Sequence, residues 1–227
     1  MANSASPVAI IGMHRSGTSC LAGCLQDLGL ELGEVNTAAP HNLKGNRENP
    51  RFWPIHDAIL SRAGASWDEP PQEPVAWTSG EIADLRAILS DYDGLHRPWG
   101  FKDPRATVLL DGWFEALPDL RLVASFRHPL AVAGSLAVRN GFDLPRALNA
   151  WTIYNLAVLR WRSITSLPLV DYDDVDYEIK VRAIAKNLAL ESKTPMPFRA
   201  EDLNHQRVSA PVPPSCAEMW AELKAST

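Results

Sequence analysis

The sequence of 227 residues has only three cysteines and no apolar run that approaches 18 residues. Three is an odd number, and Cys20 and Cys24 lie one helical turn apart, which does not suit a disulfide framework, so we expect a reducing compartment. A transmembrane helix needs about 20 apolar residues, and none is therefore expected. The opening MANSASP lacks the basic and apolar regions of a secretory signal. These absences predict a cytoplasmic protein without a membrane span.

The chain also lacks an excess of basic residues. It carries 22 Lys and Arg against 27 Asp and Glu, a net charge of −5, whereas nucleic-acid-binding proteins usually have a basic balance. We therefore expect no nucleic-acid partner, although a local basic pocket for a small anion is compatible with these numbers. No His, Cys or Asp cluster has metal-ligand spacing, so no metal site is expected. With 46% apolar residues the chain can bury a core, and its length suits a single domain over residues 1–227.

Short β-branched runs alternate with segments of helical periodicity, which predicts an α/β fold. We expect a three-layer α/β/α architecture with a central parallel sheet, like that of the phosphate-loop nucleoside-triphosphate hydrolases. The predicted strands are 8–11, 99–102, 120–126 and 167–172. The predicted helices are 21–28, 55–63, 81–89 with Ser79 as its N-cap, 108–117, 129–139, 144–164, 176–191 and 215–225. Residues 36–54 are predicted to form a long functional loop, and the Pro-rich residues 65–77 an exposed excursion.

The first predicted strand leads into the run GMHRSGTS, residues 12–19, which we call the phosphate loop. Gly12 and Gly17 have the spacing of the nucleotide-binding loop G-x-x-x-x-G-K-[ST], and its N–H groups would converge on an anion at the start of a helix. The lysine of that motif is replaced by Thr18, so a kinase would lack its main cation. Instead, Arg15 lies inside the loop, beside hydroxyls that can donate hydrogen bonds. The glycines alone are equally compatible with a turn that binds no ligand.

The run HRSGTS resembles the 5′-phosphosulfate loop of sulfotransferases that use 3′-phosphoadenosine 5′-phosphosulfate (PAPS). That family binds the 3′-phosphate with an Arg after a buried strand and a Ser eight residues later, and Arg127 and Ser135 follow this pattern. Taken alone, Arg127 is equally explained as a surface ion pair. The resemblance implies that PAPS, and the product 3′-phosphoadenosine 5′-phosphate (PAP), are bound by Arg15, Ser16, Gly17, Thr18, Ser19, Arg127 and Ser135.

Two further segments fit the resemblance, which extends over residues 8–175. The run GFKDPR at 100–105 looks like the K-D-P element of the carbohydrate and tyrosine-protein branch, and VDYDD at 170–174 is similar to a strand-end "YED". The chain is therefore expected to lie closer to that branch than to the aryl branch. The R-K-G motif that contacts the adenine in the aryl branch is absent, and Arg207 is the one candidate for that position.

The resemblance implies in-line transfer of a sulfuryl group from PAPS to a hydroxyl or amine acceptor. Arg15 and Lys102 are the expected charge-stabilising groups, and Glu48 in KGNRENP is the expected general base. On composition alone Glu48 would be a solvated carboxylate, and His56 and His41 are the alternative bases. His14 and His128 lie inside the phosphate motifs without an expected catalytic role. Arg105 is compatible both with an anionic acceptor and with an ion pair to Asp103.

The acceptor is expected to bind to the loop-rich excursion at about 36–78. A small molecule, a glycan or a lipid headgroup is compatible with its mixed chemistry, and the oligomeric state is not encoded in any pattern. Trp113, Trp151, Trp161 and Trp220 lie in helical patterns and are expected in the core. Trp53, Trp67, Trp77 and Trp99 are compatible both with stacking on the acceptor and with anchoring of loops.

Two alternative functions remain open at this point. A small-molecule kinase of the phosphate-loop superfamily would use Asp171 as its magnesium-binding acid. A non-catalytic module that binds PAPS or PAP as a sensor would share Arg15 with an enzyme. A group in line with the acceptor, such as Glu48, distinguishes an enzyme from such a module.

Overall fold

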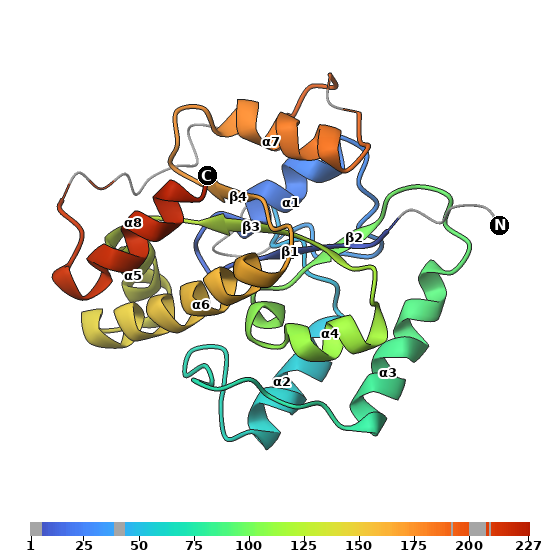
Figure 1. Cartoon of the computed structure of the whole chain (residues 1–227), viewed down its shortest axis with the longest axis horizontal. Coiled ribbons are helices and arrows are strands. Elements are labelled where there is room, and N and C mark those ends of the chain that lie inside the picture. Colours follow the sequence, from blue (N-terminus) through green and yellow to red (C-terminus); the bar gives the residue numbers. More distant parts are fainter. Residues whose placement is uncertain (1–5, 39–43, 192, 200–207, 209) are drawn as a thin grey trace.

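The computed structural model describes residues 6–38, 44–191, 193–199, 208 and 210–227. Four parallel strands form a central sheet in the order β2-β1-β3-β4 (Figure 1). The strands are β1 (Val8–Ile11), β2 (Gly100–Lys102), β3 (Arg121–Phe126) and β4 (Leu169–Asp171). Val8 pairs with Gly100 of β2 on one side and with Arg121 of β3 on the other. The predicted parallel sheet is confirmed.

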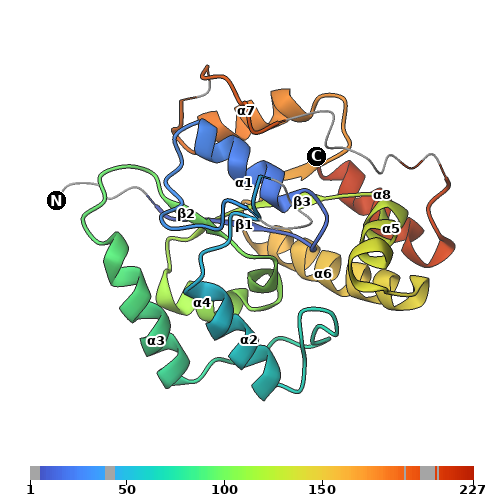
Figure 2. The same cartoon turned by 180° about the vertical axis from the view of Figure 1, so that it is seen from behind.

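The strands are apolar throughout because both faces of the sheet are covered. Along β1, Val8 and Ile10 pack into one core cluster, whereas Ala9 and Ile11 pack into the other. Helices α1 (Thr18–Asp27) and α7 (Tyr177–Asn187) cover the first face, and Figures 1 and 2 show them together on one side of the sheet. The opposite face packs against α2 (Phe52–Arg62), α3 (Ser79–Leu89), α4 (Leu110–Ala116), α5 (Pro129–Asn140), α6 (Leu144–Ile164) and α8 (Ala217–Ala225). This is the predicted three-layer α/β/α architecture.

Two helices begin earlier in the structure than the sequence predicts. Helix α3 is capped by Thr78 rather than Ser79: the Thr78 side chain accepts from the Glu81 N–H, and the Glu81 carboxylate accepts from the Thr78 N–H. Helix α2 begins at Phe52 instead of 55. Pro54 therefore lies in its first turn, where the missing N–H breaks no intrahelical hydrogen bond.

The predicted helix at 108–117 begins only at Leu110 in the structure. A 3₁₀ helix over Pro104–Val108 precedes it, capped by the Asp103 carboxylate, which accepts from the Arg105 N–H. These two short helices follow directly after the turn at the carboxyl end of β2. This turn positions Arg105 and Thr107 beside the phosphate loop.

The Pro-rich segment at 65–77, which was predicted to be exposed, packs against the rest of the structure through its tryptophans. Trp67 stacks on Phe142 at 5.7 Å between ring centroids, and its carbonyl accepts from the Tyr154 hydroxyl. A side chain on Gly112 would collide with the ring of Trp77, so that ring lies directly against α4. Its tryptophans thus anchor this segment to the helical layer.

The four tryptophans that were predicted to lie in the core do pack there. Trp113, Trp151 and Trp161 are buried, while Trp220 is partly buried against the same cluster. Trp99 is buried as well, so Trp53, at 38% exposure, is the loop-side tryptophan that most clearly faces solvent.

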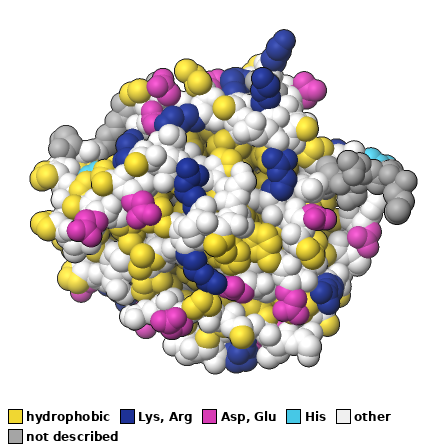
Figure 3. Space-filling view, viewed as in Figure 1, with side chains coloured by type: hydrophobic (Ala, Val, Ile, Leu, Met, Phe, Trp, Pro, Cys, Tyr) yellow, Lys and Arg dark blue, Asp and Glu magenta, His cyan; other side chains and the backbone are white. Residues whose placement is uncertain are grey.

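The surface carries mixed charge. On the face shown in Figure 3, Lys and Arg side chains lie among acidic and apolar ones, and the described residues form no continuous basic area there. Within the described ranges, no helix is both long and apolar enough to span a bilayer.

Candidate active site

The predicted site segments meet at one edge of the sheet. The phosphate loop follows β1, the Asp103–Arg105 turn follows β2, Arg127 follows β3, and Tyr172 follows β4. Since the four strands are parallel, their carboxyl ends lie at the same edge, where open α/β sheets bind ligands. Residues that are far apart in the sequence are therefore brought together by the fold.

The phosphate loop requires its two glycines for steric reasons. Gly12 has φ 129°, and a Cβ atom there would lie 2.2 Å from the carbonyl oxygen of Ser125. Gly17 is the left-handed N-cap of α1 with φ 86°, and its Cβ would lie 2.2 Å from the Tyr172 ring. Arg15 also has a positive φ, 65°, which is strained for a residue with a side chain. The backbone therefore forms a compact turn with three positive φ angles directly before α1.

Several donors in this loop have no acceptor within the described part of the chain. The N–H groups of Gly17, Thr18 and Ser19 point out of the start of α1 without a protein partner among those residues. The Ser16 hydroxyl is fully buried and likewise unpaired there. Orphaned buried donors are rare in native proteins, and at a helix N-terminus they form an anion-binding site. The donor set fits phosphate or sulfuryl oxygens.

The two phosphate motifs are in direct contact. The Arg15 Nε donates to the Ser135 Oγ at 2.7 Å, across 120 residues of sequence. Burial lowers the pKa of Arg15, and the positive charges of Arg139 and Arg127 lower it further. Three guanidinium groups therefore act on one region, and an anion bound there would relieve their mutual repulsion.

Arg127 is held in a partly buried bidentate ion pair. Its Nε and Nη2 donate to the Asp173 carboxylate at 2.8 and 3.1 Å, and its guanidinium carbon lies 4.7 Å from the centroid of the Tyr172 ring. The ion pair that sequence reasoning left as an alternative is thus present. It also fixes the orientation of a cation at the carboxyl end of β3.

Glu48 and Lys102, the predicted base and second cation, form one ionic cluster. The Lys102 Nζ lies 2.6 Å from the Glu48 Oε1, and the Arg105 Nη2 lies 3.0 Å from its Oε2. Arg105 also donates to Asp103 and contacts Asp57. Burial lowers the pKa of Arg105, but Asp103 and Glu48 raise it by more, so the net shift is upward. The ion pair of Arg105 with Asp103, one of the two alternatives that the sequence allows, is present, and Glu48 is a buried, doubly paired carboxylate.

The alternative base His56 has a structural environment. Its Nε2 accepts from the indole N–H of Trp113 at 2.9 Å, so the proton lies on Nδ1, which donates to Asp103 at 2.9 Å. Both ring nitrogens are occupied and the residue is 1% exposed. His56 is therefore unsuited to take a proton from an acceptor. His41, the other alternative, lies outside the described residues, as does Arg207.

The two histidines inside the phosphate motifs differ in their roles. His14 packs against Trp67 at 4.6 Å between ring centroids, and burial lowers its pKa well below the usual value, assisted by the charge of Arg105. His128 caps α5 by accepting from the Leu130 N–H at 3.3 Å. Both help to hold the motifs in place.

Asp171, the magnesium ligand of the kinase alternative, is already paired. Its Oδ2 lies 2.9 Å from the Lys224 Nζ on α8, and its Oδ1 accepts from the Asp173 N–H at 3.0 Å. The residue is 4% exposed. Among the described residues, no group of three His, Cys, Asp or Glu is arranged to hold a metal ion. The Asp171 carboxylate that the kinase alternative would use is thus held by Lys224 and by the backbone of Asp173.

Sequence reasoning missed two hydroxyls that brace the phosphate loop. Thr107 Oγ1 accepts from the Gly12 N–H at 2.9 Å, and Ser125 Oγ donates to the Ser16 carbonyl at 2.6 Å. Both residues are fully buried. Ser125 is a polar residue in the otherwise apolar strand RLVASF, a signal that could have identified it, whereas Thr107 carries no distinguishing pattern.

Replacing Thr107 by valine is expected to destabilise the fold and distort the loop. Valine keeps the shape but leaves the Gly12 N–H unpaired in the interior, at a cost of about 1–3 kcal/mol. Urea unfolding measures the change, with Thr165→Val as control, since the Thr165 hydroxyl donates only to a helix-end carbonyl. Equal stability of the two variants would contradict the bracing role of Thr107.

Comparison with solved structures finds bacterial sulfotransferases. The sulfotransferase domain of the Synechococcus PCC 7002 olefin synthase matches with a TM-score of 0.55 at 18% identity, covering 100% of this chain and 97% of that one. The chain has the sulfotransferase fold. Sulfotransferase STF9 from Mycobacterium avium gives a TM-score of 0.51 at 16% identity, covering 99% of this chain and 69% of that one. No family model and no curated protein sequence matches.

At these identities the matches show the fold of the chain. The identities are too low for any residue role to follow from the match, and those roles rest on the geometry described above.

Proposed function

We propose that this protein is a PAPS-dependent sulfotransferase that transfers a sulfuryl group to a hydroxyl or amine acceptor. The observation that carries the proposal is the 2.7 Å hydrogen bond between Arg15 and Ser135. Each residue belongs to a different phosphate motif, and their contact creates one basic region bounded by Arg127. A sulfuryl-group donor such as PAPS carries two separate anionic groups, one for each motif. Such a molecule uses more of these cationic and hydroxyl groups than a single phosphate does.

The chain's own groups have separate parts in binding this donor. The N–H groups of Gly17, Thr18 and Ser19 and the hydroxyl of Ser16 would hold the 5′-phosphosulfate end. Arg127 and Ser135 would hold the 3′-phosphate. PAPS supplies the activated sulfuryl group, and PAP is the product that leaves.

Glu48 would accept the proton of the acceptor hydroxyl, with Lys102 and Arg105 orienting its carboxylate. In the structure both oxygens of Glu48 are paired with these cations. One of the two contacts therefore has to lengthen when the acceptor hydroxyl approaches. Lys102 is then freed to stabilise negative charge as the sulfuryl group moves. The acceptor would approach from the side of Trp53, whose ring lies 5.9 Å from the Arg105 guanidinium.

Calorimetric titration with PAP, compared with ATP plus magnesium, tests the proposal. We expect PAP to bind and to lose about 10- to 150-fold in affinity in Arg127→Ala, because charge-assisted hydrogen bonds contribute about 1.5–3 kcal/mol. The PAP affinity of Ser135→Ala should fall about three- to tenfold, the loss expected when one hydrogen bond from an uncharged hydroxyl is removed.

The surface pair of Arg160 with Asp111 provides the matched control, since Arg160→Ala also breaks a bidentate ion pair but lies away from the site. Its affinity for PAP should be unchanged. A preference for ATP with magnesium would favour the kinase alternative. Tight PAP binding without transfer to any acceptor would favour the sensor alternative.

A further inference from the structure

Cys20 lies in the first turn of α1, directly after the phosphate loop, and the proposed function makes no use of its thiol. The Arg199 Nη1 lies 4.0 Å from its sulfur, and Cys24 lies one helical turn further along the same helix. Cys20 is partly exposed, whereas Cys24 and Cys216 are fully buried. Of the three thiols, Cys20 alone is both accessible and next to a cation.

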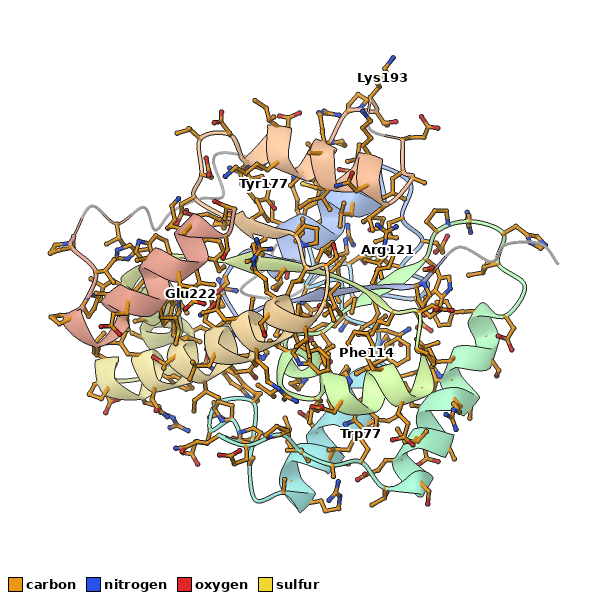
Figure 4. The ribbon with its side chains drawn as sticks, in the orientation of Figure 1. Trp77, Phe114, Arg121, Tyr177, Lys193 and Glu222 are labelled. Atoms are coloured by element: carbon orange, nitrogen blue, oxygen red, sulfur yellow. The ribbon has the colours of Figure 1, made fainter. Side chains whose placement is uncertain are left out.

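The cation beside Cys20 is directed at the sulfur. Within the described ranges, Arg199 forms no ion pair with a carboxylate. Instead its guanidinium lies 4.2 Å from the ring of Tyr177 and 5.3 Å from the ring of Tyr172. Tyr177 lies at the start of α7, in the same layer as α1 (Figure 4), and its side chain is buried there. Asp27, the nearest acid on α1, accepts from the Phe198 N–H.

These neighbours favour the thiolate form of Cys20. A hydrogen bond with Cys24 lowers the pKa of Cys20 to about 6 against the opposing effect of burial, and Arg199 and Tyr177 assist. The same hydrogen bond and burial raise the pKa of Cys24, which therefore remains a thiol. A helix N-terminus and an adjacent arginine are the features that distinguish reactive cysteines from inert buried ones.

We propose that Cys20 is a site of covalent thiol modification that takes small disulfides and other soft electrophiles. Its thiolate would attack one sulfur of a disulfide R–S–S–R, forming the Cys20–S–S–R bond as the original S–S bond breaks and RS⁻ leaves. Tyr172, beside Arg199, also lies against Gly17 and Arg127. Because Tyr172 contacts both regions, we expect an adduct on Cys20 to hinder nucleotide binding in the phosphate loop, a step that rests on the proposed function.

The pH dependence of alkylation by iodoacetamide, followed by peptide mass spectrometry, tests the reactive thiol. We expect labelling at Cys20 with a midpoint near pH 6. Arg199→Gln should move the midpoint up by about one unit, a tenfold fall in thiolate fraction, and Arg160→Gln should leave it unchanged. Cys20→Ser should abolish the labelling. A midpoint at about 8.5, the value of an ordinary thiol, or an unshifted midpoint in Arg199→Gln, would overturn the proposal.

Protection by PAP tests the competition separately. At ~100 times the Kd of PAP, labelling of Cys20 should slow about 100-fold because only the free protein reacts. Treatment with methyl methanethiosulfonate should abolish PAP binding in the wild type but not in Cys20→Ser, and dithiothreitol should restore it. Unchanged labelling with PAP bound would overturn the competition. If PAP does not bind the untreated protein, the proposed function fails, while the pH profile still decides whether Cys20 is reactive.

Discussion

Replacing Glu48 by glutamine is expected to reduce transfer by about 100-fold or more while leaving the affinity for PAP within about twofold of the wild type. General-base catalysis contributes about 10²–10⁴-fold, and glutamine cannot take a proton. Its amide oxygen can still accept from Lys102 and its size is unchanged, whereas its NH2 group cannot accept from Arg105. Calorimetry measures PAP affinity, and the conversion of PAPS to PAP in the presence of an acceptor measures turnover.

Asp57→Asn is the control for this variant, because Asp57 also contacts Arg105 but is more exposed than Glu48. Turnover of this variant should change little. Loss of a buried partner can destabilise a protein by about 3–5 kcal/mol, so urea unfolding of Glu48→Gln must accompany the kinetics. A folded Glu48→Gln variant with wild-type turnover would rule out Glu48 as the base.

Replacing Arg15 by alanine is expected to weaken PAP binding by about 10- to 150-fold, the effect of losing a charge-assisted hydrogen bond. Turnover at saturating PAPS should fall by a further 100- to 1,000-fold. This is roughly the effect of removing one hydrogen-bond donor that stabilises the negative charge of a transition state. Arg15→Lys should recover part of the binding, because it keeps the charge but not the directed contact with Ser135.

Arg139→Ala is the matched control for Arg15. Arg139 contributes positive charge near Arg15, as its effect on the pKa of Arg15 shows, yet it is exposed at the end of α5. The Arg139→Ala variant should bind PAP only slightly more weakly than the wild type. At high salt the two affinities should be equal, since exposed charges are screened. Equal losses in the two variants would mean that general positive charge, rather than the position of Arg15, governs binding.

The sheet and its loops were predictable because their signals are local. Buried strands such as VAII at 8–11 are short β-branched runs bounded by Pro and Gly, and the glycines of the phosphate loop mark a turn that only they can adopt. Parallel pairing then places the following loops at one edge. The order of segments along the chain therefore predicted where the candidate site lies.

The contacts within the site were not predictable, because they depend on distances between segments far apart in the sequence. Nothing local indicates that Glu48 pairs with Lys102 or that Trp113 donates to His56. The excursion at 65–77 was expected to be exposed because its prolines exclude regular structure. Its tryptophans instead pack on α4 and Phe142, an outcome set by tertiary packing rather than by local propensity.

The position of β1 in the sheet has a consequence for how the chain folds during synthesis. β1 precedes the other three strands of this sheet in the sequence, yet its Val8 pairs with Gly100 and Arg121. At about 5–20 residues per second, the phosphate loop emerges roughly ten seconds before β3 is complete at Phe126. During that interval β1 has at most β2 as a strand partner, and non-local pairing of this kind slows folding. Truncated chains that end before β3 should therefore stay unfolded and depend on chaperones to remain in solution.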